Sequence, residues 1–211
     1  MIRRGIEKQI KEDVFQGKAI LLFGPRQVGK TTAVEAILQQ MNVSFLHLNG
    51  DEADVREALQ STTSTQLRRL FGENKIVFID EAQRIDGIGI TLKLITDSLK
   101  DVQVIATGSS AFDLASGTQE SLTGRKYEHF MYPLSFGEMV EHHGLLEEKR
   151  LLDQRLIMGY YPEIVEKPDQ AMRNIKELTN SYLYKDLLQL ESIKKPVLLT
   201  KILKALALQV G

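Results

Sequence analysis

The sequence contains no cysteine among its 211 residues, which excludes disulfide bonds and cysteine metal sites. It also lacks a long apolar run. Residues 19–23, AILLF, form the longest such run near the start and are far short of the roughly 20 residues that a membrane-spanning helix needs. Residues 1–15 contain basic side chains but no continuous apolar segment, unlike a secretory signal. We therefore expect a cytoplasmic protein without a membrane partner.

The charge balance gives little indication of a polyanionic partner. The net charge is -1, so no overall excess of basic residues points to nucleic acid or to an anionic membrane. Hydrophobic residues make up 43% of the chain and charged residues 26%, which is ordinary for a globular protein. The length fits one large domain, or one domain with a small appendage.

Short apolar segments alternate with amphipathic segments over the first two thirds of the chain. This alternation predicts an α/β fold with a five-stranded, mainly parallel sheet between helices. The expected strands are residues 18–23, 43–49, 75–81, 102–110 and 126–134, and the expected helices are residues 6–15, 30–41, 54–60, 64–71 and 89–99.

After residue 134 the pattern changes to helices alone. We expect them over residues 135–143, 146–158, 168–191 and 197–210, with prolines between them. This change predicts three parts: a core over residues 1–134, a small all-helical lid over 135–195, and the start of a further domain over 196–211.

The segment GPRQVGKTT, residues 24–32, joins the first expected strand to the second expected helix. It matches the G-x-x-x-x-G-K-[ST] phosphate-binding loop. Glycines let consecutive N–H groups converge on phosphate oxygens, and the helix that follows adds its positive N-terminal end. Lys30 would reach the β- and γ-phosphates of ATP, and the Thr31 hydroxyl would bind Mg²⁺. The expected nucleotide-binding residues here are Gly24, Pro25, Arg26, Gln27, Val28, Gly29, Lys30, Thr31 and Thr32.

Two acidic residues end the third expected strand, IVFIDE. Asp80 would hold Mg²⁺ through its water shell, together with Thr31. Glu81 would orient and deprotonate the attacking water. A carboxylate in this second position favours hydrolysis over transfer to a substrate hydroxyl. The alternative for Glu81 is a solvated acid at a strand end.

The fourth expected strand ends in small polar residues, VIATGSS. Thr107, Ser109 and Ser110 are candidates to detect the γ-phosphate or the attacking water. We expect the contact from Ser109 or Ser110, and the residues do not distinguish the two. Small residues after a strand are also common in ordinary loops.

Five segments in the order FGPRQVGKTT, FIDEAQRI, TGSSAFDL, LTGRKYEHFMYPLSFGE and GYYPEIV resemble a family of prokaryotic P-loop ATPases related to the AAA+ and STAND groups. The resemblance covers nearly the whole chain, and LTGR…PLSFGE is its most specific part. It implies a central phosphate-loop strand, with the fourth strand between that strand and the acidic one. It also implies a winged-helix region and a C-terminal nuclease-like domain, which has no counterpart in this sequence.

The resemblance suggests two further roles. Arg125 would neutralise phosphate charge as an arginine finger, in its own site or in a neighbouring copy's; a structural ion pair is the alternative. Tyr160 and Pro162, in a segment similar to a glycine-x-proline motif, would contact adenine; a helix-breaking turn is the alternative. His142 and His143 are adjacent, which is poor spacing for metal ligands.

The sequence therefore predicts a Mg²⁺-dependent ATPase whose hydrolysis of ATP to ADP drives a conformational change. The alternative is a module that holds ATP or ADP without hydrolysis, as a switch or scaffold. A homo-oligomer is left open, and DNA remains a candidate partner through a domain outside this sequence. The last expected helix carries a broad apolar stripe, so we also expect it to open a further domain; its members are Leu198, Leu199, Ile202, Leu203, Leu206 and Val210.

Overall fold

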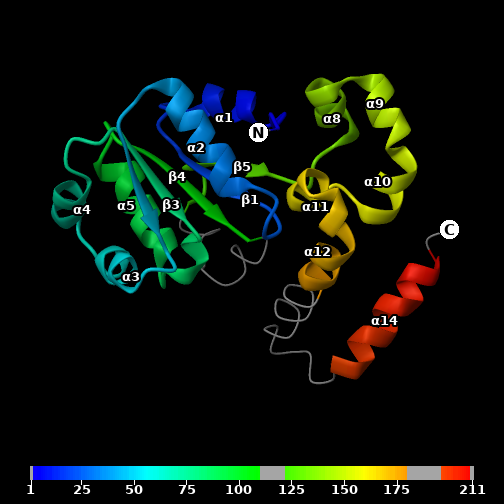
Figure 1. The fold of residues 1–211 in the computed structure, drawn as a ribbon. Helices are drawn as coiled ribbons and strands as arrows, with labels where there is room; N and C mark the ends of the chain where they lie inside the picture. Colours follow the sequence, from blue (N-terminus) through cyan, green and yellow to red (C-terminus); the bar gives the residue numbers. More distant parts are fainter. Residues whose placement is uncertain (1, 110–121, 180–195, 210–211) are drawn as a thin grey trace. The chain divides into compact units, whose positions relative to one another are not determined.

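The computed structural model describes residues 2–109, 122–179 and 196–209 and contains two compact units, residues 1–151 and 152–211 (Figure 1). In the first unit, five strands form one sheet in the order β2-β3-β4-β1-β5, and all neighbouring pairs are parallel. The predicted α/β fold is confirmed. The strands are β1 (Ala19–Phe23), β2 (Phe45–Asn49), β3 (Ile76–Asp80), β4 (Gln103–Gly108) and β5 (Lys126–Phe130).

The order of the strands corrects one detail and supports another. The phosphate-loop strand β1 is an interior strand, but the middle strand is β4, because β5 adds only one strand beyond β1. As expected, β4 lies between β1 and the acidic strand β3. The carboxyl ends of β1, β3 and β4 therefore meet at one edge of the sheet.

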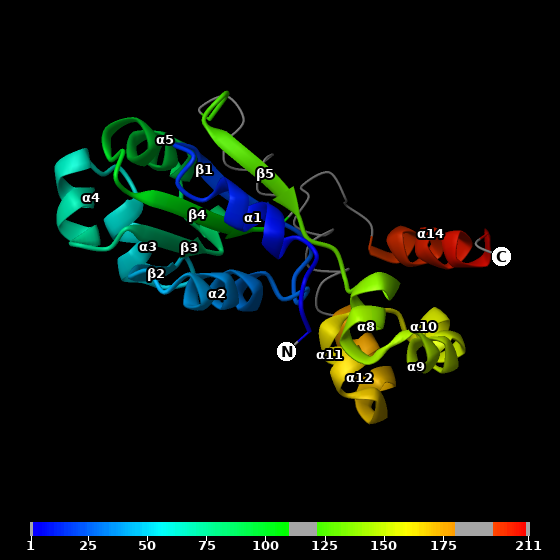
Figure 2. The same ribbon diagram turned by 90° about the horizontal axis from the view of Figure 1, so that it is seen from above.

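Helices cover both faces of this sheet (Figures 1 and 2). All residues of β1, β3 and β4 are buried, which explains their continuous apolar sequences. Among the described residues before β5, the helices are α1 (Glu7–Asp13), α2 (Lys30–Met41), α3 (Ala53–Leu59), α4 (Ser64–Phe71) and α5 (Ile88–Ser98), with a short 3₁₀ helix η1 (Ala82–Arg84) after β3.

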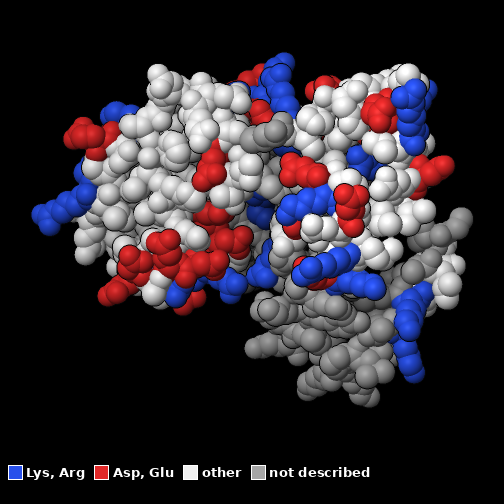
Figure 3. All heavy atoms as spheres, viewed as in Figure 1, with Lys and Arg blue, Asp and Glu red and all other residues white. Residues whose placement is uncertain are grey.

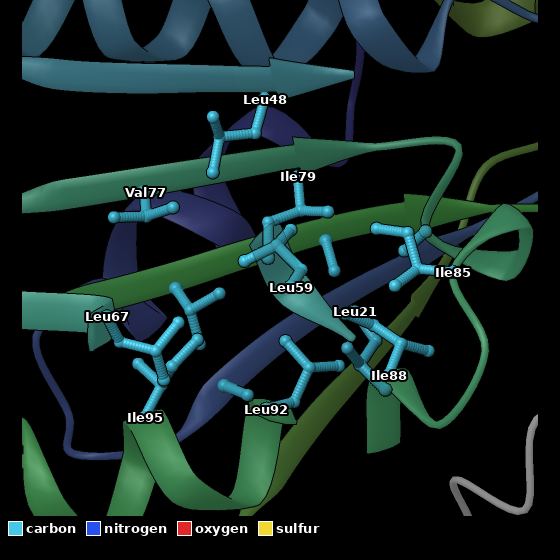
Figure 4. Packing of buried hydrophobic residues seen from close by; sticks show 14 of the residues in the cluster. Leu21, Leu48, Leu59, Leu67, Val77, Ile79, Ile85, Ile88, Leu92 and Ile95 are labelled. Carbon is cyan, nitrogen blue, oxygen red and sulfur yellow. The ribbon is translucent and has the colours of Figure 1, made fainter. Parts of the chain in front are cut away.

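One hydrophobic cluster fills the space between the sheet and helices α3, α4 and α5 (Figure 4). Alternate residues of the strands point into it, such as Leu21 of β1 and Ile79 of β3. Leu59, Leu67 and Leu92 meet them from the three helices. This packing fixes the strand ends from which the candidate site is built.

Two helices after β5 also belong to the first unit: α8 (Phe136–His143) and α9 (Leu145–Arg150). The units divide after Leu151 rather than at residue 134. Ser135 and Glu138 form a capping box at the start of α8, and Glu138 also pairs with Arg4 near the N-terminus. These long-range contacts join α8 to the core, and no local sequence pattern indicates them.

The second unit is helical, as expected for residues after 134. It contains α10 (Leu152–Met158), α11 (Pro162–Glu166), the 3₁₀ helix η2 (Pro168–Gln170), α12 (Ala171–Leu178) and α14 (Pro196–Gln209). Ile202 and Leu206 of the expected apolar stripe are exposed. Throughout the described ranges, every helix is too short or too polar to cross a membrane.

Candidate functional site

The loop after β1 has the backbone of a phosphate-binding loop. Gly24 has a φ of 155°, and a Cβ there would lie 2.2 Å from the carbonyl oxygen of Met131, so only glycine fits. Gly29 has a φ of 90° and precedes α2 as its N-cap. The loop is therefore enclosed by β1, α2 and the segment after β5, with the N-terminus of a twelve-residue helix directed at its interior.

Lys30, the first residue of α2, lies buried within this loop. Its Nζ donates hydrogen bonds to the carbonyl oxygens of Gly24 and Pro25, both at 2.9 Å. Burial lowers the pKa of Lys30, while the nearby carboxylates of Glu81 and Asp80 act in the opposite direction. The cation thus lies within the loop, where phosphate oxygens would replace the two carbonyl groups as its partners.

Asp80 connects three elements at the carboxyl edge of the sheet. The Thr31 hydroxyl at the start of α2 donates to Asp80 Oδ2 at 2.7 Å. The Thr107 hydroxyl, near the end of β4, donates to Asp80 Oδ1. Asp80 is 7% exposed, so both hydrogen bonds are largely shielded from water. Of the two fourth-strand candidates that the structure describes, Thr107 and Ser109, it is Thr107 that reaches the acidic residue.

Thr31 and Asp80 fit a magnesium ion in their chemistry. A hydroxyl and a carboxylate are the hard oxygen ligands that Mg²⁺ takes. The described residues contain no group of three or more His, Cys, Asp or Glu side chains that would hold a metal alone. This also fits, because nucleotide-bound Mg²⁺ uses one or two protein ligands together with phosphate oxygens and water.

Glu81 has a strained backbone directly beside Asp80. Its φ and ψ are 49° and 41°, a left-handed conformation that non-glycine residues rarely adopt. Its N–H group lies 3.1 Å from Asp80 Oδ1, and its Oε2 accepts a hydrogen bond from Gln83 Nε2 at 2.5 Å. The chain therefore leaves the extended backbone of β3 at Glu81, immediately after Asp80.

Gly50, the residue after β2, supports this turn. Its N–H group donates to the carbonyl of Asp80 at 2.8 Å, and a Cβ at this position would lie 2.5 Å from the carbonyl oxygen of Glu81. Neither Gly50 nor Gln83 belongs to a motif that indicates a site residue. The only signal for Gln83 was its position two residues after Glu81, and the strand end before Gly50 was the only signal for that glycine.

Comparison with known protein families identifies this arrangement. The model of a family described as an AAA domain matches residues 16–140, which is more than half of the chain. The chain belongs to the AAA domain family. It is a P-loop protein of the AAA+ ATPase type, and the matched range contains the loop, Asp80, Glu81 and Thr107. A second family model, of a domain of unknown function, matches residues 149–211.

Two curated relatives of this chain are replication factor C large subunits. The replication factor C large subunit of Pyrobaculum islandicum is 30% identical over 116 residues, which are 50% of this chain and 27% of that protein. The same subunit of Pyrobaculum aerophilum is 36% identical over 86 residues, or 39% and 20% of the two chains. The chain thus spans about a quarter of the length of these relatives. A crystal structure of Pif1 helicase from Candida albicans matches with 11% identity and a TM-score of 0.46, covering 67% of this chain and 42% of that one.

The AAA domain places Arg125 at the opposite edge of the sheet from the phosphate loop. The carbonyl of Arg125 pairs with the N–H group of Ala19 at the start of β1, whereas the loop follows Phe23 at its end. A five-residue strand spans about 16 Å. The Arg125 guanidinium instead pairs with Asp97 of α5 at 2.7 Å. A role for Arg125 in its own site is therefore wrong for this arrangement, because the strand separates it from the phosphates.

The remaining predicted residues lie at the margin of the AAA domain or in the second unit. Ser109 follows β4 and is half-buried, and Ser110 lies outside the described residues. In the second unit, Tyr160 has the Arg155 guanidinium 5.8 Å from its ring centre, and Pro162 begins α11. The adenine contacts of Tyr160 and Pro162 stay predictions. The guanidinium of Arg4, a residue outside every sequence motif of the site, donates to the carbonyl of Val28 within the loop.

Proposed function

We propose that this AAA domain binds ATP with Mg²⁺ at residues 24–32 and hydrolyses it to ADP and phosphate. The observation that supports this most is the carboxylate of Asp80, which Thr31 and Thr107 approach from two other elements while Glu81 follows directly. Phosphate loop, metal ligands and a water-activating acid thus share one edge of the sheet.

Each residue has a task in this proposal. Lys30 and the N–H groups of the loop bind the β- and γ-phosphates and stabilise the charge that develops during transfer. Thr31 and Asp80 hold Mg²⁺, which neutralises phosphate charge when bound. Glu81 accepts a proton from the attacking water, and its separation from Gln83 frees the carboxylate for this step. Thr107 keeps Asp80 oriented.

Turnover would then change the conformation of the chain, because the contacts that the loop makes with γ-phosphate are lost on hydrolysis. The helical second unit is the candidate responder, through Tyr160 and Pro162. A homo-oligomer that completes the site from a second copy is part of the same proposal, since Arg125 does not reach the phosphates of its own chain.

A non-hydrolysing switch is the second candidate function. The hydrogen bond between Glu81 and Gln83 favours it, because a carboxylate that stays bound to an amide does not accept a proton from water. In that case the chain would bind ATP and ADP, and wild-type protein would release no phosphate above background.

One set of variants tests the proposal. Lys30→Ala should weaken ATP binding, and Glu81→Gln should bind MgATP as tightly as wild type while phosphate release falls at least about a hundred-fold. Glu57→Gln, at an exposed glutamate of α3, is the matched control and should behave as wild type. Unaltered turnover in Glu81→Gln would remove Glu81 from catalysis, and equal binding by Lys30→Ala would contradict the nucleotide site itself.

DNA is a candidate stimulator of phosphate release, because the curated relatives are replication factor C large subunits. Phosphate release should be measured with and without DNA. Figure 3 shows a gathering of acidic side chains on the part of the first unit where α3 lies in Figure 1, and the sequence has exposed Asp51, Glu52 and Asp54 around the start of α3. That surface would repel a phosphate backbone, so a DNA partner would have to bind elsewhere.

A further inference from the structure

The guanidinium of Arg4 contacts three segments that are far apart in the sequence. Nη1 donates to the carbonyl of Val28 at 2.7 Å, Nη2 donates to the carbonyl of Tyr132 at 2.5 Å, and Nε donates to Glu138 Oε1 at 3.0 Å. Arg4 is only 7% exposed. A guanidinium holds its donors in a rigid fork, so one side chain fixes the phosphate loop, the segment after β5 and α8 relative to one another.

The hydrogen bond from Arg4 to the Val28 carbonyl also fixes the direction of the next N–H group, that of Gly29, which Arg4 does not contact. In a trans peptide, the carbonyl of one residue and the N–H group of the next point in opposite directions. The N–H group of Gly29 therefore points away from Arg4. Gly29 is the N-cap of α2, where free N–H groups meet a bound anion. By holding the carbonyl of Val28, Arg4 orients this N–H group.

The bond to Tyr132 acts at the other end of the loop. The neighbouring N–H group of Met131 donates to the carbonyl of Phe23 at 2.8 Å, and the Met131 carbonyl fills the space that a Cβ on Gly24 would need. Arg4 thus holds the segment after β5, which the loop contacts at Gly24, and also the peptide between Val28 and Gly29 near the other end of the loop.

Glu138 provides the countercharge to Arg4. Its Oε1 accepts hydrogen bonds from Arg4 Nε and from the N–H group of Gly5, and its Oε2 accepts one from the N–H group of Ser135. Partial burial alone would raise the pKa of Glu138, but these hydrogen bonds and the Arg4 charge outweigh it and lower the pKa. Glu138, which belongs to α8, is therefore an anion at neutral pH.

We propose that Arg4 is a positioning residue for the phosphate loop: it holds the loop in its nucleotide-binding shape and connects that shape to the start of α8 through Glu138. The inference rests on the proposed nucleotide site but names a residue outside it. A purely structural arginine would stabilise the fold equally, yet its loss would leave the nucleotide affinity of the folded protein unchanged.

The test compares Arg4→Met, Arg4→Lys and Arg3→Met by calorimetric titration with MgADP and by hydrogen exchange of residues 24–30 without nucleotide. Arg4→Met should weaken MgADP binding about ten-fold or more, as expected when binding groups are misplaced, and should accelerate exchange in the loop. Arg4→Lys should recover only part of the affinity, because one ammonium does not reproduce the fork. Arg3 is an exposed neighbour, so Arg3→Met is the matched control and should match wild type.

Folded Arg4→Met with wild-type affinity and wild-type exchange would overturn the proposal, even if its melting temperature falls. If Arg4→Met does not fold, Glu138→Gln replaces it. This variant keeps the side-chain shape and removes the charge, and it should weaken MgADP binding a few-fold; no change in affinity or loop exchange would overturn the proposal. Wild type that binds no MgADP would contradict the proposed function, whereas the exchange of the nucleotide-free loop would still decide the role of Arg4.

Discussion

The side-chain amide of Gln83 donates a hydrogen bond to the carboxylate of Glu81, with 2.5 Å between Nε2 and Oε2. The carbonyl oxygen of the same amide is buried and has no hydrogen-bond partner within the described part of the chain. An unsatisfied buried acceptor costs about 1 to 3 kcal/mol. The hydrogen bond therefore restrains the Glu81 carboxylate but leaves the Gln83 carbonyl oxygen without a partner. Because this arrangement is not optimal for Gln83, we expect the hydrogen bond to break during turnover.

Gln83→Ala should raise basal phosphate release about five-fold. A net hydrogen bond of about 1 kcal/mol no longer competes with the attacking water for the Glu81 carboxylate, and 1.36 kcal/mol corresponds to ten-fold in rate. Steady-state phosphate release at saturating MgATP measures the effect, with Gln39→Ala, at an exposed position of α2, as the control. A fall in turnover would show that the amide orients Glu81 for catalysis rather than restraining it.

Thr107→Val should lower the free energy of unfolding by about 1 to 3 kcal/mol, because it deprives the buried carboxylate of Asp80 of a donor without changing the side-chain shape. Urea unfolding measures this. The same variant should need more Mg²⁺ for half-maximal turnover, since Asp80 is no longer oriented. Thr107→Ser retains the hydroxyl and should recover most of both properties; a serine variant as defective as the valine variant would assign the effect to packing.

The contribution of Glu138 to stability should disappear in acid. Its pKa is lowered in the folded protein, so the stabilisation is complete above the pKa of the unfolded chain and is lost as the pH falls through the lower folded value. The difference in unfolding free energy between wild type and Glu138→Gln should be largest near neutral pH and shrink below about pH 4. A difference that does not depend on pH would mean that the charge of Glu138 contributes nothing.

Arg125→Ala should leave the unfolding free energy close to that of wild type, because its ion pair with Asp97 is exposed to solvent. If Arg125 acts on a neighbouring copy, mixing Arg125→Ala with Lys30→Ala subunits should restore phosphate release that neither has alone. Each variant assayed separately provides the baseline. Mixtures as inactive as their components would leave Arg125 with the structural role that its contact to Asp97 supports.

The sequence indicated the parts of the site that depend on short-range order. The loop from Gly24 to Thr32 and the acids at the end of β3 are contiguous motifs, and alternation of strands with helices predicts a parallel sheet that aligns their ends. The sequence also predicted the fourth strand. Thr107 lies inside β4, directly after Ala106, which pairs with Ile79, and from there its hydroxyl reaches Asp80. The register of the strands decides this, and the sequence does not specify it.

Two of the residues that sequence motifs do not indicate, Arg4 and Glu138, act across a long distance in the chain. Arg4 and Glu138 are 134 positions apart, and Arg4 looked like one basic residue in a basic N-terminal segment. The same contact moves the boundary of the first unit beyond α8, because a change from strands to helices does not show which helices pack on the core. Arg125 was placed near the phosphates by motif resemblance, whereas the direction of β5 carries it to the opposite edge of the sheet.

Gly50 limits how this region can vary. A single methyl group there would displace the carbonyl of Glu81, at 2.5 Å, and with it the strained turn after Asp80. A random-mutagenesis screen should therefore recover Gly50→Ala among inactive clones that keep every polar group of the site and still express. In a survey of natural variants, we expect any residue other than glycine at this position to indicate a protein that does not hydrolyse ATP, even where the phosphate loop and both acids are intact.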